Sequence, residues 1–324
     1  MDVEGVIAIM LGEANITKSE STAATYNYQD TLVASQRVNW RIEDIIGGDK
    51  KLDLAKPFMP ESLARISELG FLRDEEKLRL NQIKGHTYLV MFGLVEEFIL
   101  PFVVGHVGST LDSDDYQVRA FLQFASEEAK HIHLFKRFQE EFNAIFPVDC
   151  SVIGPGSEIA KEILSHQPLA VALAILGIEW MSQRHYIDSI KDDQGLDPQF
   201  KSLLKNHWLE EAQHAKLDTL MVEEMAKGMT EEQIASAVDE YLEIGGFLDD
   251  GLKQQTIFDL EAMERVSGRT LSDEEREEFL EKQLQANRWT YIGTALTHPK
   301  FLETLGKLSP TQRQRIEEIA PAFC

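Results

Sequence analysis

The stretches EEAKH (127–131) and EEAQH (210–214) decide the fold, because they are two copies of one pattern that lie 83 residues apart. In the first copy, Glu128 and His131 stand three residues apart. Side chains with this spacing project from the same face of a helix. A single Glu-x-x-His could be an ordinary solvated helix face, but two matching copies indicate an internal repeat.

The repeat includes a further glutamate in each half of the chain. Glu96 precedes Glu128 by 32 residues, and Glu179 precedes Glu211 by the same number. Glu211 and His214 are the glutamate and histidine of the second copy. Each half therefore carries one glutamate followed by a Glu-x-x-His at a fixed distance.

The predicted turns support this interpretation independently. Facing residues of an antiparallel helix pair lie equally far from the turn that joins the helices. The midpoints of the two glutamate pairs fall within GSTLDSDD (108–115) and KDDQGLDP (191–198), which are rich in turn-forming residues. Both pairs then lie about 24 Å from their turns. The two helix hairpins present matching half-sites at the same depth.

The surroundings of the first glutamate of each half point to a metal. Glu96 stands among Leu94, Val95, Phe98 and Ile99. An ionised carboxylate in an apolar setting costs several kcal/mol unless a cation meets it, and few Lys or Arg are placed to do so. A pair of metal ions is the simplest partner. Two sets of Glu plus Glu-x-x-His form the carboxylate dinuclear site of ferritin-like four-helix bundles. The predicted metal ligands from this pattern are Glu96, Glu128, His131, Glu179, Glu211 and His214.

His207 breaks the symmetry of the repeat. It precedes Glu211 by four residues and His214 by seven, so the three side chains share one helix face. The equivalent position in the first half is Phe124. His207 would give one metal an additional nitrogen ligand; packing against Trp208 is the alternative.

With this third histidine, the second half resembles the para-aminobenzoate N-oxygenase family. The motif His-x-x-x-Glu-x-x-His occupies 207–214, and the resemblance covers roughly residues 75–225 with no specific match in the tail. It implies a di-iron centre that activates O₂ and oxidises a small substrate, in some members an arylamine to a nitro compound. The ligands that it implies are Glu96, Glu128, His131, Glu179, His207, Glu211 and His214.

The neighbours of the ligands leave other interpretations open. Glu127 and Glu210 each precede a predicted ligand, where a carboxylate can hydrogen-bond a metal-bound histidine or simply face solvent. Many ribonucleotide reductase small subunits have a radical tyrosine one helical turn after the first histidine, but Phe135 stands there. Phe92 and Phe98 are candidates for the wall of an apolar cavity, with core packing as the alternative.

The sequence of the whole chain predicts an all-α fold. We expect a single ferritin-like domain over 1–324, with an internal two-fold repeat, a core bundle at about 74–227, a helical tail at about 230–324 and an N-terminal arm over 1–60. Thr230 and Ser309 are predicted to cap helices of the tail. The predicted helices are 74–106, 115–144, 157–165, 168–191 and 197–227.

Composition narrows the environment and the partners. The 324 residues carry a formal net charge of −23, which disfavours nucleic-acid binding. The two cysteines, Cys150 and Cys324, form no disulfide framework, so a reducing cytoplasm fits best. The N-terminus lacks the features of a signal peptide. The apolar stretch 88–104 is interrupted by two glutamates and makes a poor membrane span.

Together these observations predict an oxidoreductase, namely an O₂-activating dinuclear iron oxygenase or oxidase that acts on a small organic substrate. Monooxygenase activity is expected, and N-oxygenation of an amine is one option. The cofactor is two Fe ions, with Mn able to replace one, and O₂ is the co-substrate. A small-molecule substrate and an external electron donor are expected, without nucleic acid or membrane, and a homodimer is compatible with the sequence. A radical generator like the reductase subunits, a ligand-binding oxidase and a non-enzymatic iron-binding protein stay open as alternatives.

Overall fold

The computed structural model describes residues 26–109, 111–112 and 114–324, and it is all-α: the elements named within these residues are helices. Four long helices form the core bundle, and their bounds agree with the predicted ones to within a few residues. They are α5 (Asp74–Ser109), α6 (Asp115–Ile145), α8 (Pro168–Arg184) and α9 (Pro198–Met225). A π-helical segment, η2 (His185–Ile190), continues α8 to the end of the predicted helix.

The internal repeat extends to the way in which the helices begin. α6 and α9 are the second helices of two hairpins, and each starts at an aspartate whose carboxylate accepts a hydrogen bond from a backbone N–H of the first turn. Asp114 accepts from Tyr116 N at 2.6 Å, and Asp197 accepts from Phe200 N at 2.7 Å. The two caps are 83 residues apart, like the two Glu-x-x-His copies. Equal cap positions set the two hairpins in equal register.

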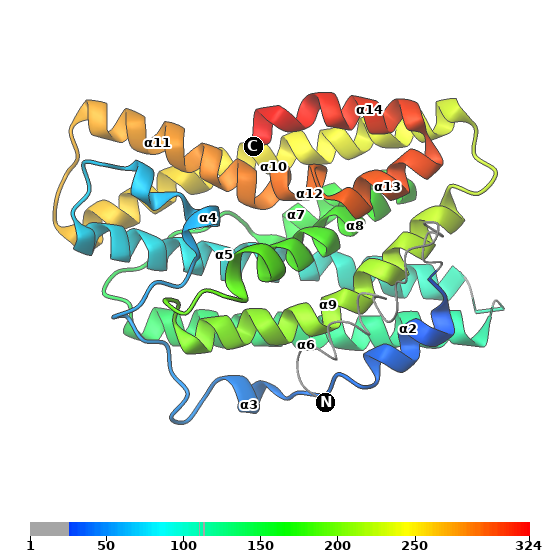
Figure 1. Cartoon of the computed structure of the whole chain (residues 1–324), viewed down its shortest axis with the longest axis horizontal. Coiled ribbons are helices and arrows are strands. Elements are labelled where there is room, and N and C mark those ends of the chain that lie inside the picture. Colours follow the sequence, from blue (N-terminus) through cyan, green and yellow to red (C-terminus); the bar gives the residue numbers. More distant parts are fainter. Residues whose placement is uncertain (1–25, 110, 113) are drawn as a thin grey trace, which may run out of the picture.

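The bundle is layered (Figure 1). α5 packs against α6 and α8 against α9, while α6 also contacts α9. The short α7 (Gly156–Ile163) lies against α5 in the connection between the hairpins. The predicted metal ligands therefore point into the space that α5 and α8 on one side and α6 and α9 on the other enclose.

The tail adds a further layer of helices beyond α5 and α8. α10 (Glu231–Ser267) lies along both helices, and it begins at the predicted cap, because Thr230 accepts from Gln233 N at 3.3 Å. The predicted cap at Ser309 is also confirmed, since its hydroxyl accepts from Gln312 N at 3.1 Å. The remaining tail elements are α11 (Asp273–Arg288), η3 (Trp289–Gly293), α12 (Thr294–Leu296), α13 (Pro299–Leu308), α14 (Pro310–Ile319) and η4 (Ala320–Phe323).

Residues 1–25 of the predicted N-terminal arm lie outside the described part of the chain, and its residues 26–60 contain two short helices. α2 (Tyr28–Ser35) and α3 (Ile42–Ile45) pack on the outer face of α6 and α9. The chain then crosses to the other side, where α4 (Glu61–Ala64) contacts α11 and is followed by η1 (Ile66–Glu68).

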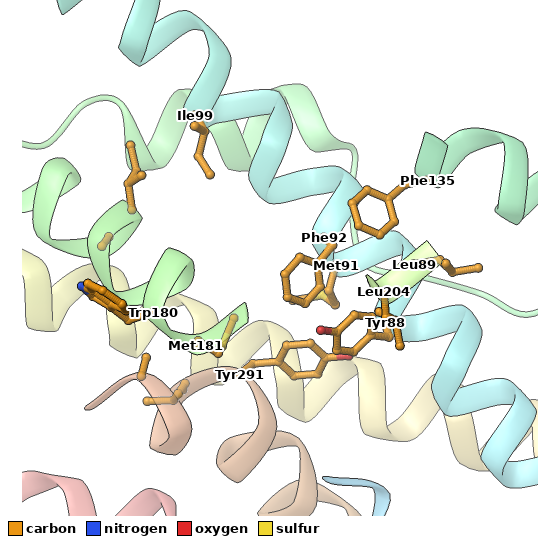
Figure 2. Packing of buried hydrophobic residues seen from close by; sticks show 14 of the residues in the cluster. Tyr88, Leu89, Met91, Phe92, Ile99, Phe135, Trp180, Met181, Leu204 and Tyr291 are labelled. Carbon is orange, nitrogen blue, oxygen red and sulfur yellow. The ribbon is translucent and has the colours of Figure 1, made fainter. Parts of the chain in front are cut away.

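Aromatic side chains join the layers into one hydrophobic core. Figure 2 shows Tyr88 and Phe92 projecting from α5, with Phe135 of α6 on one side and Tyr291 of η3 on the other. The rings of Tyr88 and Phe92 stack with centroids 4.3 Å apart, and those of Tyr88 and Tyr291 are 6.1 Å apart. The bundle and the tail thus share one core.

α5 is also the one described helix that is long and apolar enough to cross a membrane by length and composition. Within the fold, 56% of its most apolar window is buried, and Glu96 on this helix is 2% exposed. A central core helix that is covered on most sides passes the same test. The apolar character of α5 is therefore accounted for by its place in the bundle.

The buried His86 of α5 leads to a prediction about acid stability. Burial lowers the pKa of its imidazole to about 4, and the ring stacks on Phe142 with centroids 4.6 Å apart. The folded state binds a proton at His86 less well than the unfolded state does. The contribution of neutral His86 to the free energy of unfolding is therefore fully present above about pH 6.5 and is lost as the pH falls toward 4. The loss is about 1.4 kcal/mol per pH unit within that window.

We therefore expect His86→Phe to flatten the dependence of the free energy of unfolding on pH between about 6.5 and 4, as measured by urea denaturation. The exposed His133 of α6 provides the control variant His133→Phe, which should leave the slope unchanged. An unaltered slope in His86→Phe would show that His86 does not contribute.

Candidate metal centre

All seven predicted ligands are buried and come from the four core helices. α5 and α8 each supply one glutamate, and α6 and α9 supply the rest. None of these residues is more than 4% exposed, which is unusual for glutamates. The set consists of Glu96, Glu128, His131, Glu179, His207, Glu211 and His214.

Six of the seven fall into two overlapping groups whose potential ligand atoms lie within 4.8 Å of one another. In the first group, His207 Nε2 is 3.0 Å from both Glu96 Oε1 and Glu211 Oε1. His131 Nδ1 lies 2.9 Å from the same Glu211 Oε1 and 3.9 Å from Glu96 Oε1. Two imidazole nitrogens and two carboxylates therefore surround one position.

The second group lies around His214. Its Nδ1 is 2.8 Å from Glu128 Oε1 and 3.2 Å from Glu211 Oε2. Glu211 thus turns one carboxylate oxygen toward each group, as a ligand that bridges two ions does. Glu179 is outside both groups, but its carboxyl hydrogen-bonds Glu211, and its Oε2 is buried without a hydrogen bond to any described residue.

The buried ligand atoms of the two groups are better suited to binding a pair of metal ions than to hydrogen-bonding one another. His131 Nδ1 and Glu211 Oε1 are close together, yet neither has a hydrogen-bond partner within the described residues. Both oxygens of Glu128 are likewise buried and lack hydrogen bonds to described residues. Buried polar atoms are normally hydrogen-bonded, and buried nitrogen and oxygen atoms that converge in this way can bind metal ions once their protons are released.

Two outer carboxylates hold the histidines in place, and they do so across the halves of the repeat. Glu127 Oε2 is 2.9 Å from His214 Nε2, and Glu210 Oε2 is 2.8 Å from His131 Nε2. In the neutral form of each imidazole, Nε2 can donate to its carboxylate, and the lone pair of Nδ1 is then available to a metal ion. The hydrogen-bonding role that the sequence left open for both glutamates is confirmed.

The N-terminal arm supports these outer carboxylates. Ser35 of α2 donates to Glu127 Oε1 at 2.6 Å. Lys130 pairs with Glu210, and its ammonium lies 3.8 Å from the centre of the Trp40 ring. Nothing in the local sequence of Ser35 or Trp40 predicts these contacts, because they depend on how the arm folds back over α6 and α9.

Protonation balances the charge of the cluster when no metal is bound. Burial alone would lower the pKa of His131, but the surrounding carboxylates, Glu211 foremost, raise it to about 9. His214 has a pKa well above its usual value for the same reason, with the Glu211 charge opposing the effect of burial. Burial and the Glu211 charge raise the pKa of Glu179. Metal ions would take the place of these protons.

The second half differs from the first at two positions of the ligand-bearing face. His207 corresponds to Phe124, whose ring stacks on His214 with centroids 3.9 Å apart. Asp218 corresponds to Phe135, and both of its carboxylate oxygens are buried without a hydrogen bond to a described residue. Asp218 was not among the predicted site residues. It follows His214 by four residues, so the helical period could have identified it.

Aromatic rings close the centre on the side of His207. Phe92 and Phe135 lie with their ring centroids 5.6 and 5.0 Å from that of His207. Phe92 therefore packs the core beside a predicted ligand, whereas Phe98 lines an apolar cavity on the other face of α5. Phe92 thus has the core-packing role that the sequence left open, and the cavity that Phe98 lines includes none of the predicted ligands.

The comparisons with known proteins find similarity among solved structures alone. No family model matches the chain, and no curated protein matches it. Among solved structures, an R2-like ligand-binding oxidase variant with an Fe/Fe cofactor aligns at 15% identity and a TM-score of 0.45, covering 85% of this chain and 98% of that one. A variant of an R2-like ligand-binding oxidase with a Mn/Fe cofactor gives 14% identity, a TM-score of 0.43 and the same coverage. Because these identities and TM-scores are low, any function proposed for the chain rests on the side chains of the metal centre.

The outer carboxylates provide a test of the centre. Glu127→Gln removes the charge that holds His214, so we expect metal affinity to fall by about 10- to 100-fold, measured by competition between the protein and a chelator for Co²⁺. The control is Glu97→Gln, because Glu97 is partly exposed and pairs with Lys136 at 3.2 Å on the surface of the bundle. Equal affinities in the two variants would contradict the role of Glu127.

Proposed function

We propose that the protein is an O₂-activating dinuclear iron oxidase or oxygenase that acts on a small organic substrate. The observation that carries the proposal is the placement of Glu211, whose two oxygens face two separate groups of histidine and glutamate ligands. A buried carboxylate that joins two such groups is suited to bridging two cations.

The donor set favours iron. Carboxylate oxygens with a few imidazole nitrogens and no thiolate suit Fe²⁺, and Mn²⁺ is compatible with the position that has more oxygen ligands. Each group contains two glutamates and two histidines, with His131 and Glu211 common to both. The carboxyl groups of Glu179 and Asp218 interact with His214, so the position near Glu128 and His214 is the one with more oxygen atoms around it. When bound, the reduced metal pair would supply the electrons for O₂ activation.

The protein's own residues position and insulate the centre. Glu127 and Glu210 fix the orientation of the two Nδ1 atoms, and Phe92, Phe124 and Phe135 exclude water around the imidazoles. The use of an external electron donor stays a prediction. N-oxygenation of an amine is the finer form of the proposal, and the support for it is the third histidine through the family resemblance.

One observation favours a second candidate function, the generation of an organic radical. Phe135 stands at the position of the radical tyrosine of many reductase subunits. A different tyrosine, Tyr88, stacks on Phe92, and Phe92 in turn contacts the ring of His207. Its hydroxyl is 3.0 Å from His185 Nδ1. Thr294 Oγ1 donates to Thr290 O, so His185 Nε2 must donate to Thr294, and Nδ1 can accept the proton of Tyr88.

The experiment that tests the proposed function is anaerobic loading with Fe²⁺ followed by exposure to O₂ and absorbance spectroscopy. We expect two iron ions per chain, rapid O₂ consumption and new near-ultraviolet or visible absorption, with oxidation of added small amines or aldehydes. Fewer than two ions, or no reaction with O₂, would contradict the proposal. A lasting radical in electron paramagnetic resonance that is absent from Tyr88→Phe, without substrate oxidation, would favour the second candidate.

The role of His207 has its own test, His207→Phe, which gives the second half the residue that the first half has at Phe124. We expect the helical content to be unchanged and two Co²⁺ ions still to bind, but one of them about 10-fold or more weakly and with altered visible bands. A Co²⁺ spectrum and titration identical to those of the natural protein would reduce His207 to a packing residue.

A further inference from the structure

A cavity of about 530 Å³ lies on the far side of the core helices from the metal centre. Its walls come from α5, α7, α8, α10 and the end of the tail, and none of the seven predicted metal ligands lines it. Met91 and Phe98 of α5 face it, whereas Glu96 points away. Its volume falls within the range of pockets that bind small molecules, about 300–1,000 Å³.

The glycines of α10 indicate that the space is kept open. Gly245 is on the same face of the helix as the buried Tyr241 and Leu252, yet a Cβ built on it would have no atom within 4 Å. Two successive glycines, Gly245 and Gly246, lie in the middle of a 37-residue helix, where every residue except proline has a higher helix propensity than glycine. Protein interiors are otherwise close-packed, so an open volume beside two glycines is a space that a ligand can fill.

The walls define what the occupant must be. The lining side chains are almost all aliphatic or aromatic, with hydroxyl groups at Tyr241 and Tyr291, and none of those that line the cavity is Lys, Arg or His. The one lining carboxylate, Asp250, is 78% exposed and pairs with Lys253 at 2.8 Å. A carboxylate or phosphate ligand would therefore be buried without a cation, at a large cost.

The cavity reaches the surface beside α10. Phe247 lines it and is 41% exposed, which places an aromatic side chain at its edge. Exposed apolar residues at the rim of a pocket are typical of ligand entry sites. A ligand could enter here without passing the metal centre.

We propose that this cavity is a binding site for an uncharged, largely hydrocarbon small molecule, separate from the metal centre. The proposal does not rest on the proposed oxidase function, because the residues that form the cavity hold no metal. The hydroxyl group of Tyr241, which would lie 3.8 Å from a Cβ on the lining residue Gly177, can hydrogen-bond a single polar group of such a ligand, and apolar contacts would hold the rest of it.

The test uses the full-length protein, with and without metal, and the uncharged fluorophore N-phenyl-1-naphthylamine. We expect saturable fluorescence enhancement in both forms. Gly245→Leu on α10 and Ala174→Leu on α8 each add a larger side chain to the cavity lining and should weaken probe binding by about tenfold or more while leaving the circular dichroism unchanged. The control Gly105→Leu places the same side chain at an exposed, open position of α5 and should have no effect.

Displacement of the probe then tests the charge of the ligand. 1-Dodecanol should displace it, and dodecanoate at about pH 8 should do so about tenfold less well or not at all. Absence of probe binding, or equal binding in both cavity-filling variants and the natural protein, would overturn the site. Equal displacement by the alcohol and the carboxylate would overturn the assignment of an uncharged ligand.

Discussion

The structure depends on one constraint, the burial of four glutamates at one level of a helical bundle. Glu96, Glu128, Glu179 and Glu211 come from four different helices and are all 2% exposed or less. Carboxylates in such a place need cations, and the histidines supply positive charge only while they hold protons. Bound metal ions would meet the same need permanently. The bundle is thus arranged around a charge balance that its own side chains cannot complete without protonation.

The internal symmetry serves this balance, and the departures from it give each position its own chemistry. Glu127 and Glu210 cross between halves to hold the two histidines in the same way. Beside them, His207 enriches one position in nitrogen, while Asp218 adds a carboxylate near the other. Two ions in a symmetric cage would be equivalent; here they would differ in ligands, which is useful where one ion binds O₂ or substrate.

Much of this arrangement could be predicted, because it follows from helical geometry. The repeat of EEAKH and EEAQH locates the ligands, since residues three or four apart share a face and hairpin partners lie equally far from a turn. The same period would have included Asp218. The contacts of Ser35 and Trp40 could not be predicted, because they depend on the path of the arm. The cavity beside Gly245 depends on how α5, α7, α8, α10 and the end of the tail pack together, which side-chain periodicity does not report.

The most direct test of the central claim is anomalous X-ray diffraction from crystals of the protein loaded anaerobically with Fe²⁺. The account predicts two iron peaks per chain about 3.5–4 Å apart, one on each side of Glu211. His131 and His207 should coordinate the first ion and His214 the second. A single peak, or two peaks that do not share Glu211, would contradict the dinuclear centre.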